Sequence, residues 1–271
     1  MRIPFIKMHG LGNDFVVLDG RKNDLPAMTA KAASGLANRR TGVGCDQVIV
    51  LVPSDTADFR MRIFNADGSE VEACGNASRA VALLHGKAAN VQTDGGVIAL
   101  SPAQGGASVD MGTPRFEWDA IPLAYAMDTS AMPVGWGDGM LEGPMAVNVG
   151  NPHAVFVVDD ADAVDLTALG PEIENDPVFP ERINVNVLSR VSDNHIKLHV
   201  WERGSGLTRA CGTGACASAV AAIKKGLVQS PVTVSLPGGD LIIEWQQGGS
   251  ITMTGPASEA FRGELNWADY A

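Results

Sequence analysis

The sequence predicts a mixed α/β protein made of two homologous halves. A segment that runs from an alternating strand through a polar turn to a cysteine and a Gly-rich helix start occurs twice, around Cys74 and around Cys211. These cysteines lie 137 positions apart, which is close to half of the 271 residues. Several landmarks that recur in one order at one spacing are hard to obtain by chance, so we interpret them as a duplicated fold.

The repeat extends well beyond the cysteines. Two alternating strands coincide at the shift of 137, with apolar and basic residues in matching positions, and a buried strand precedes each of them. A Gly-Asn pair recurs 138 positions later, and a hydrophobic run ended by aspartate follows it both times. The matches are Phe59–Phe64 with Ile196–Trp201, Gln47–Leu51 with Asn184–Leu188, and Gly12-Asn13 with Gly150-Asn151.

In the first half, β-branched runs ended by turn residues predict strands, and Ala-rich runs predict helices. Thr29 is a candidate N-cap for the first helix, and Gly86 is a stop signal for the second. The strands are predicted at residues 13–20, 47–52, 59–64, 97–100 and 108–112, and the helices at 29–40 and 77–86.

The second half repeats this order of elements. We predict strands at 154–158, 183–188, 196–201, 232–236, 241–245 and 251–254, with helices at 161–169 and 213–225. Residues 113–122 are the predicted linker, and the Gly-rich stretch 127–142 is predicted to be a loop. The resulting domains are residues 1–117, on which the tail 262–271 packs, and residues 118–261.

Composition limits the possible functions. The net charge is −11 and no window is rich in Lys or Arg, which argues against a nucleic-acid partner. The N-terminus lacks the pattern of a secretory signal, and no apolar run is long enough for a membrane span, so we expect a cytoplasmic protein. Four cysteines are too few for a disulfide scaffold, and their spacing is not that of a zinc site.

Cys74 and Cys211 are candidate catalytic residues. A helix N-terminus carries free N–H groups and partial positive charge, which predicts a thiol pKa below about 8.5 and a place to bind a carboxylate. The glycines beside both cysteines allow a ligand to approach the backbone closely. Cys45 and Cys216 have no counterpart in the other half, and we predict that they are structural.

Two equivalent cysteines suit inversion at a carbon atom. In a duplicated fold with a pseudo-twofold axis, equivalent groups can meet opposite faces of one ligand. One thiolate then removes a proton while the opposite thiol returns one, and the two exchange roles with the direction of the reaction. Donors aimed at the ligand carboxylate would stabilise the negative charge that develops.

Several motifs together resemble the diaminopimelate epimerase family, over about residue 6 to Gly263. The motifs are long and specific. They are Lys7–Phe15, Asn65–Ser69, Cys74-Gly75-Asn76, Asn151-Pro152-His153, Glu202-Arg203-Gly204 and Ala210–Gly214. One departure is Ala77, which stands where the family usually has a glycine.

The resemblance implies a fold of two pseudo-twofold-related halves, each a mostly antiparallel curved sheet or barrel around a central helix. It implies interconversion of LL- and meso-diaminopimelate, on the way to lysine and peptidoglycan, with no pyridoxal cofactor and no metal, by a homodimer. Cys74 and Cys211 match the two bases, and His153 and Glu202 match groups that assist them. The positions that match substrate contacts are Asn13, Gln47, Asn65, Gly75, Asn76, Asn151, Asn184, Glu202, Arg203, Gly212 and Thr213.

Other functions stay open on the sequence alone. A proline or hydroxyproline racemase would use the same two cysteines, although Arg203 and the paired asparagines favour a substrate with a second carboxylate. An isomerase of the PhzF type is disfavoured because both cysteines are present. A non-catalytic amino-acid-binding protein, or a redox sensor that forms a Cys74–Cys211 disulfide, belongs to a different class.

Overall fold

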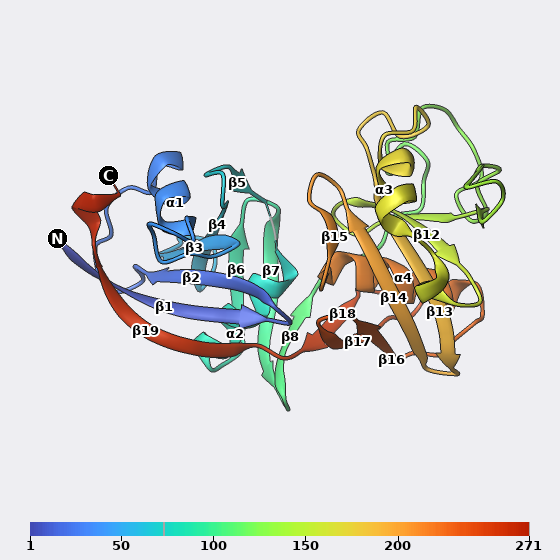
Figure 1. Cartoon of the computed structure of the whole chain (residues 1–271). Helices are drawn as coiled ribbons and strands as arrows, with labels where there is room; N and C mark the ends of the chain where they lie inside the picture. Colours follow the sequence, from blue (N-terminus) through green and yellow to red (C-terminus); the bar gives the residue numbers. More distant parts are fainter. Residues whose placement is uncertain (73, 271) are drawn as a thin grey trace. The chain divides into compact units, whose positions relative to one another are not determined.

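The structure, a computed structural model, describes residues 1–72 and 74–270, which form two compact units (Figure 1). Unit 1 consists of residues 1–109 and the C-terminal segment from Thr254, and unit 2 of residues 110–253. Within the described part of the chain, no helix is long and apolar enough to cross a membrane.

The described part of unit 1 is a mostly antiparallel sheet with two helices. Its strands are β1 (Arg2–Gly10), β2 (Asn13–Asp19), β3 (Gln47–Val52), β4 (Phe59–Asn65), β5 (Glu70–Val71), β6 (Ala89–Thr93), β7 (Gly96–Ala103), β8 (Gly106–Asp110) and β19 (Ser258–Asn266). The helices are α1 (Ala30–Ala37) and α2 (Gly75–His85), and a 3₁₀ turn, η2 (Trp267–Asp269), follows β19. Strand β19 pairs along almost the whole of β1, so both ends of the chain belong to this unit.

The start of α1 and the end of α2 lie where local sequence signals predict them, whereas α1 ends at Ala37, before the predicted residue 40. The Thr29 side chain accepts a hydrogen bond from the Ala32 N–H and caps α1, as expected. Gly86 ends α2 in the left-handed region at φ 76°, a conformation that costs glycine little. The small residues of α2 let it sink into the unit, and every residue from Asn76 to Ala82 is buried.

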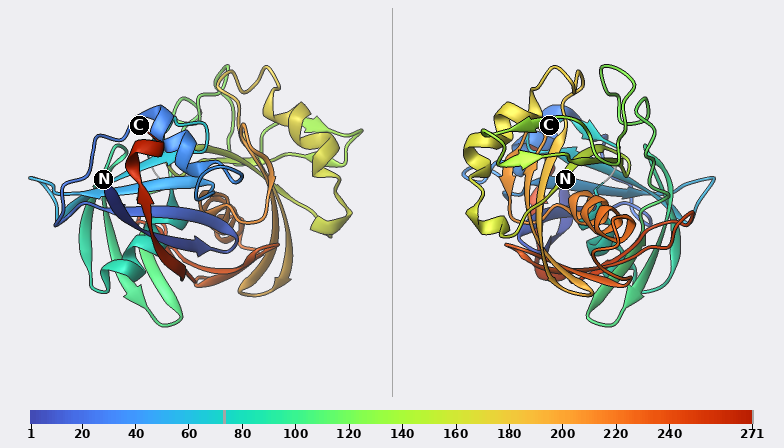
Figure 2. Two further views of the ribbon diagram at one scale, coloured as in Figure 1. Left: turned by 60° about the vertical axis from the view of Figure 1, so that its left-hand side comes forward. Right: turned by 90° about the vertical axis from the view of Figure 1, so that its right-hand side faces the viewer.

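Unit 2 is also a mostly antiparallel sheet with helices, and it has an additional hairpin, β9–β10. Its strands are β9 (Gly135–Trp136), β10 (Leu141–Glu142), β11 (Met145–Asn148), β12 (Pro152–Val157), β13 (Asn184–Ser192), β14 (His195–Glu202), β15 (Gly206–Thr208), β16 (Val232–Leu236), β17 (Gly239–Glu244) and β18 (Thr252–Gly255), the last of which crosses into unit 1. The helices are η1 (Ala161–Ala163), α3 (Leu166–Glu174) and α4 (Gly212–Lys224). Helix α4 is surrounded by strands in the right view of Figure 2, and most of its residues are buried.

The two units pair their strands in the same way. The pairs β1–β2, β2–β3, β3–β4, β4–β5, β4–β6 and β6–β7 have counterparts β11–β12, β12–β13, β13–β14, β14–β15, β14–β16 and β16–β17, each with the same direction. Their registers also agree, because Val48 pairs with Phe64 and Val185 pairs with Trp201. Equal registers at the predicted shift support the interpretation of a repeat, and the α+β fold class is confirmed.

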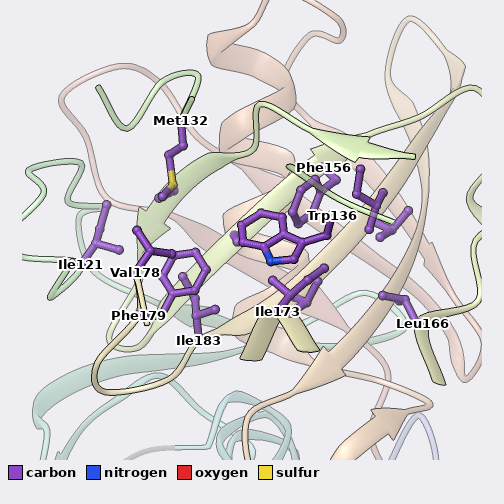
Figure 3. Close-up of a cluster of buried hydrophobic side chains, with 14 of the residues drawn as sticks. Ile121, Met132, Trp136, Phe156, Leu166, Ile173, Val178, Phe179 and Ile183 are labelled. Carbon is purple, nitrogen blue, oxygen red and sulfur yellow. The ribbon is translucent and has the colours of Figure 1, made fainter. Parts of the chain in front are cut away.

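The prediction of a loop at 127–142 was wrong. Part of this stretch forms the β9–β10 hairpin, and Trp136 lies in the core of unit 2 between Phe156 and Phe179, with ring centroids 5.8 Å and 6.1 Å away (Figure 3). Met132 and Leu141 are buried in the same cluster. Glycines hide the alternation of apolar and polar residues that would predict strands here, because only isolated side chains of the stretch point into the core.

The helix predicted at 161–169 is also displaced. Asp165 accepts hydrogen bonds from the N–H groups of Thr167 and Ala168, and it therefore starts α3 at Leu166. Residues 161–163 form only a 3₁₀ turn, capped by Asp160. Strands β1, β6, β11 and β19 were not predicted.

Candidate functional site

The first candidate half-site surrounds Cys74, which immediately precedes α2 in unit 1 and is half-buried. Its thiol donates to Oδ1 of Asn13, with Sγ and Oδ1 3.9 Å apart. Nδ2 of Asn76 donates to the same oxygen at 3.2 Å. The turn between β1 and β2 and the start of α2 are thus joined at the cysteine.

Neighbouring charges fix how these two amides are turned. Nδ2 of Asn13 donates to Asp46 at 2.9 Å, so its oxygen faces the thiol. The buried Arg79 donates to Oδ1 of Asn76 at 2.8 Å, so the nitrogen of Asn76 faces the site. Because a carboxylate only accepts and a guanidinium only donates, neither amide can turn over without losing a charge-assisted hydrogen bond.

Asp14 anchors the turn that carries Asn13. Burial by itself raises the pKa of this carboxyl, but hydrogen bonds from Arg39 and Lys7 outweigh burial and hold the pKa well below its usual range. Asp14 also accepts from the backbone N–H of Asp46 at 3.0 Å. Asp14 therefore stays ionised and holds the turn in place at neutral pH.

Gln47 and Asn65 form the edge of the same half-site. They are paired across β3 and β4, and Nε2 of Gln47 donates to Oδ1 of Asn65 at 3.0 Å. Nδ2 of Asn65 donates to Ser69. Within residues 1–72 and 74–270, the buried Oε1 of Gln47 accepts no hydrogen bond, which leaves it as an acceptor for a ligand.

The second candidate half-site surrounds Cys211, the N-cap residue of α4 in unit 2. Its Sγ accepts from the backbone N–H of Gly214 at 3.3 Å and lies 3.5 Å from Oγ1 of Thr213. The side chain is only 4% exposed. Cys74 and Cys211 thus occupy the same position at the start of equivalent helices.

The expected lowering of the Cys211 pKa was wrong. Burial raises the pKa of this thiol, and the nearby Glu202 carboxylate raises it further, although Thr213 and the Gly214 N–H act in the opposite direction. Burial also raises the pKa of Glu202, whose partners include Thr208 and Cys211. The helix N-terminus is present, but loss of solvent and a like charge outweigh it.

The turn after β14 carries Arg203 and is held by two buried side chains. Oδ1 of Asn184 accepts from the Arg203 backbone N–H at 2.9 Å, and its Nδ2 donates to the Pro152 carbonyl at 2.8 Å. Glu174 accepts from the Gly204 N–H at 2.9 Å and from Nε1 of Trp201 at 2.7 Å. These bonds fix the backbone that positions Glu202 and Arg203.

His153 lies deep in unit 2, with no exposed surface. Nδ1 is 3.1 Å from Oδ1 of Asn186, and Nε2 is 3.0 Å from Oδ1 of Asn151. Burial lowers the pKa of His153 to about 4, and the charge of Arg203 acts in the same direction. The imidazole is therefore neutral at pH 7, and both ring nitrogens have asparagine partners.

Comparison with known proteins identifies the family. The sequence pattern of the family described as diaminopimelate epimerase matches residues 5–117 and 145–259. A diaminopimelate epimerase of Erythrobacter litoralis is 69% identical over 100% of both chains. That of Sphingopyxis alaskensis is 60% identical over 98% of both chains, and that of Zymomonas mobilis is 54% identical over 100% of both.

This chain belongs to the diaminopimelate epimerase family. The resemblance predicted from the motifs is confirmed. Solved structures with lower identity share the fold: a PhzF-family phenazine biosynthesis protein of Bacillus anthracis has a TM-score of 0.69 at 14% identity, covering 98% of this chain and 99% of its own. A hydroxyproline epimerase of Agrobacterium vitis has a TM-score of 0.67 at 15% identity, covering 97% and 91%.

The residues that match the family's site divide between the units. Unit 1 carries Asn13, Gln47, Asn65, Cys74, Gly75 and Asn76, and unit 2 carries Asn151, His153, Asn184, Glu202, Arg203, Cys211, Gly212 and Thr213. Hydrogen bonds join Asn13 to Cys74 and Asn76, Gln47 to Asn65, His153 to Asn151, and Asn184 to the Arg203 backbone, whereas Gly75 and Gly212 supply backbone at the helix starts. Their roles as substrate contacts stay predictions. In the described ranges, no three His, Cys, Asp or Glu side chains could hold a metal ion.

The sequence did not single out the residues that support each half-site. Asp46, Arg79, Glu174 and Asn186 orient the predicted residues without having been predicted themselves. Asn186 had a usable signal, because it interrupts an apolar run inside a buried strand. Cys45 and Cys216 are both buried, and burial raises the pKa of Cys45 to about 11.

Proposed function

We propose that this protein is an isomerase that converts LL-2,6-diaminopimelate to the meso isomer with Cys74 and Cys211 as its acid and base. Membership of the diaminopimelate epimerase family supports the reaction. The observation that supports the mechanism is the equivalence of the two cysteines, each of which immediately precedes the buried helix of its own unit. A fold requires no such pair of thiols, whereas inversion at one carbon requires two opposed proton-transfer groups.

The proposed reaction is a transfer of protons without a change of oxidation state. One cysteine, as thiolate, removes the hydrogen from the α-carbon, and the electron pair that remains is delocalised into the adjacent carboxylate. The other cysteine, as thiol, gives its proton to the opposite face. Backbone N–H groups at Gly75 and Gly212 and the side chains of Asn76 and Thr213 are the proposed donors to that carboxylate, where negative charge develops.

Glu202 is the proposed partner of Cys211 in this cycle. A buried thiol beside a carboxylate is a poor source of free thiolate, because its negative charge would be added to that of Glu202. The same carboxylate can accept the thiol proton when the sulfur acts as the base. Burial raises the pKa of Glu202, so this carboxylate has a higher affinity for that proton than an exposed carboxylate has.

The remaining polar side chains are proposed to bind the far end of the substrate. Arg203 can pair with the distal carboxylate, and its guanidinium is anchored through Nη1 to the Glu181 carbonyl at 2.9 Å. Gln47 offers an unused acceptor to an ammonium group. The proposed amide contacts to the distal end are Asn13, Asn65, Asn151 and Asn184. We also propose that the protein is a cytoplasmic homodimer that uses neither pyridoxal nor a metal ion.

Hydrogen exchange tests the proposal directly. The reduced protein, free of pyridoxal and treated with a chelator, is incubated with LL-diaminopimelate in D₂O and the α-hydrogen is followed by NMR. We expect deuterium to enter as the meso isomer appears. If neither exchange nor the meso isomer is detected, the proposed activity is wrong.

Cysteine variants test the mechanism separately. Cys74→Ala and Cys211→Ala should each reduce inversion by at least about 10²-fold, the usual contribution of one acid or base. Each variant should still exchange the α-hydrogen of the isomer that faces its remaining cysteine. Cys45→Ala serves as the control and should retain inversion, because its thiol is buried apart from the proposed chemistry.

The same assay separates the other candidates. Inversion of proline or hydroxyproline, with none of diaminopimelate, would favour the racemase alternative. Binding of diaminopimelate without exchange would favour a non-catalytic binding protein. Activity that requires oxidation, with a Cys74–Cys211 disulfide detected by mass spectrometry, would favour a redox sensor.

A further inference from the structure

Unit 2 contains a buried polar cluster at positions where unit 1 is apolar. The cluster consists of His153 on β12, Asn186 on β13 and Ser218 on α4, none of which has exposed surface. The repeat shift and the equal strand registers give each a counterpart, since Val17 pairs with Ile49 in unit 1 as Val155 pairs with Asn186 in unit 2. The counterparts are Phe15, Ile49 and Val81, which are also fully buried.

The fold itself does not need these polar groups. Unit 1 has the same pairing pattern with hydrocarbon at all three positions, and a buried polar group without a hydrogen-bond partner destabilises a folded protein. The cluster is satisfied only because its members bond one another and the backbone of α4. Such a network specifies side-chain orientation more than it adds stability.

The orientation of Asn186 is determined by the chain. Its Nδ2 donates to the Gly214 carbonyl and to Oγ of Ser218, both at 2.9 Å. A carbonyl only accepts, so the nitrogen of Asn186 must face Gly214 and its oxygen must face Nδ1 of His153. Ser218 does not determine the orientation of the Asn186 amide, because a hydroxyl can both donate and accept a hydrogen bond.

We propose that Asn186 is a positioning residue that fixes His153 as the neutral tautomer protonated on Nδ1, and leaves Nε2 as an acceptor. Nδ1 needs a proton to bond the Asn186 oxygen, and a neutral imidazole carries only one. A second proton on Nε2 would make a buried cation, which the low pKa of about 4 opposes at pH 7.

This tautomer in turn orients Asn151. Nε2 has a lone pair and no proton, so the Asn151 amide must turn its nitrogen to the ring, within the 3.0 Å that separates the two side chains. One N–H of Asn151 then binds His153, and the second stays available for a carboxylate oxygen of a ligand. Gly214 thus orients Asn186, which orients His153, and His153 in turn orients Asn151. The backbone at the start of α4 therefore determines how a predicted substrate contact is turned. This consequence for binding rests on the proposed function, whereas the tautomer does not.

Long-range ¹⁵N–¹H correlation NMR of the labelled protein at pH 7 tests the proposal, because it distinguishes the two tautomers and the cation by the chemical shifts of the ring nitrogens. The chain has five histidines, and a His153→Gln variant identifies the signals of this one. We expect His153 to be protonated on Nδ1 alone. Protonation on Nε2, or on both nitrogens, would overturn the proposal even if the protein is fully active.

Variants test whether Asn186 is the cause. Asn186→Leu mimics Ile49 of unit 1 and should fold, but His153 should lose its single tautomer and KM for diaminopimelate should rise by about 10-fold, the value of one lost neutral hydrogen bond. Ser218→Ala is the matched control, and it should keep the Nδ1 tautomer because Gly214 still orients Asn186. Asn186→Asp keeps an acceptor at Nδ1, so it should keep the tautomer and raise the pKa of His153. If Asn186→Leu leaves the Nδ1 tautomer intact, another group fixes it and the assignment to Asn186 is wrong.

Discussion

Protonation of His153 should destabilise the folded protein in a defined pH range. Burial lowers the pKa of this imidazole from 6.5 to about 4, so the unfolded chain takes up the proton first as the pH falls. The contribution to stability is fully present above pH 6.5, is lost between pH 6.5 and about 4, and changes no further below that range.

The size of the effect follows from the shift. At about 1.4 kcal/mol per pKa unit, the whole change is about 3 kcal/mol, and about 2 kcal/mol of it should be lost between pH 7 and pH 5. Solvent does not screen this effect, because His153 has no exposed surface. Its ring faces Asn151 and Asn186, which do not titrate.

Urea unfolding of the wild type and of His153→Gln at pH 7 and pH 5 measures the prediction. The variant should lose about 2 kcal/mol less than the wild type over this interval, because glutamine does not titrate. Other groups, such as His85, whose pKa is also lowered by burial, contribute equally to both proteins and cancel in the difference. Equal losses of unfolding free energy in the two proteins would refute the reasoning that His153 is a buried neutral base.

Further predictions concern packing, the turn after β14 and the thiol. Gly170→Ala would place a methyl carbon 2.4 Å from the Trp201 ring and should cost about 1–3 kcal/mol in thermal unfolding, whereas Gly95→Ala, with its nearest atom at 3.4 Å, should cost less. Glu174→Gln weakens the bonds to Trp201 and the turn, so we expect a loss of about 1.5 kcal/mol and a KM that rises more than kcat falls. Iodoacetamide should label Cys211 at least about 10-fold more slowly than free cysteine at pH 8, measured by mass spectrometry, and equal rates would contradict its raised pKa.

The sequence predicted the elements whose signals are local. The caps at Thr29 and Gly86 and the alternating strands β4 and β14 depend on residues a few positions apart, and all of them are present. Strand β1 was not predicted, since Pro4 disfavours a strand and its partner β19 lies at the other end of the chain. Pairing over that distance has no local signature.

Residues of the candidate site were predicted where the two halves of the sequence could be aligned. They were not predicted where contacts made only in the folded chain determine what a residue does. Cys74 and Cys211 were found because they coincide at one shift. The direction of the Cys211 pKa was missed, because it depends on burial and on Glu202, which the chain places beside the sulfur only after folding. Asn186 was missed for the same reason, because its partners come from two other elements.

The two half-sites share a backbone plan but differ in the chemistry around the sulfur. Cys74 donates to the amide oxygen of Asn13, a neutral acceptor, whereas Cys211 lies beside the carboxylate of Glu202. A neutral acceptor stabilises a thiol without taking its proton, and a carboxylate can take it. If both sulfurs act on one α-carbon as proposed, replacing Glu202 by Gln should therefore slow one direction of the reaction more than the other in single-turnover experiments, although the equilibrium between the isomers stays the same. Equal slowing of both directions would contradict this reasoning, because it would mean that the variant leaves the relative energies of the two bound states unchanged.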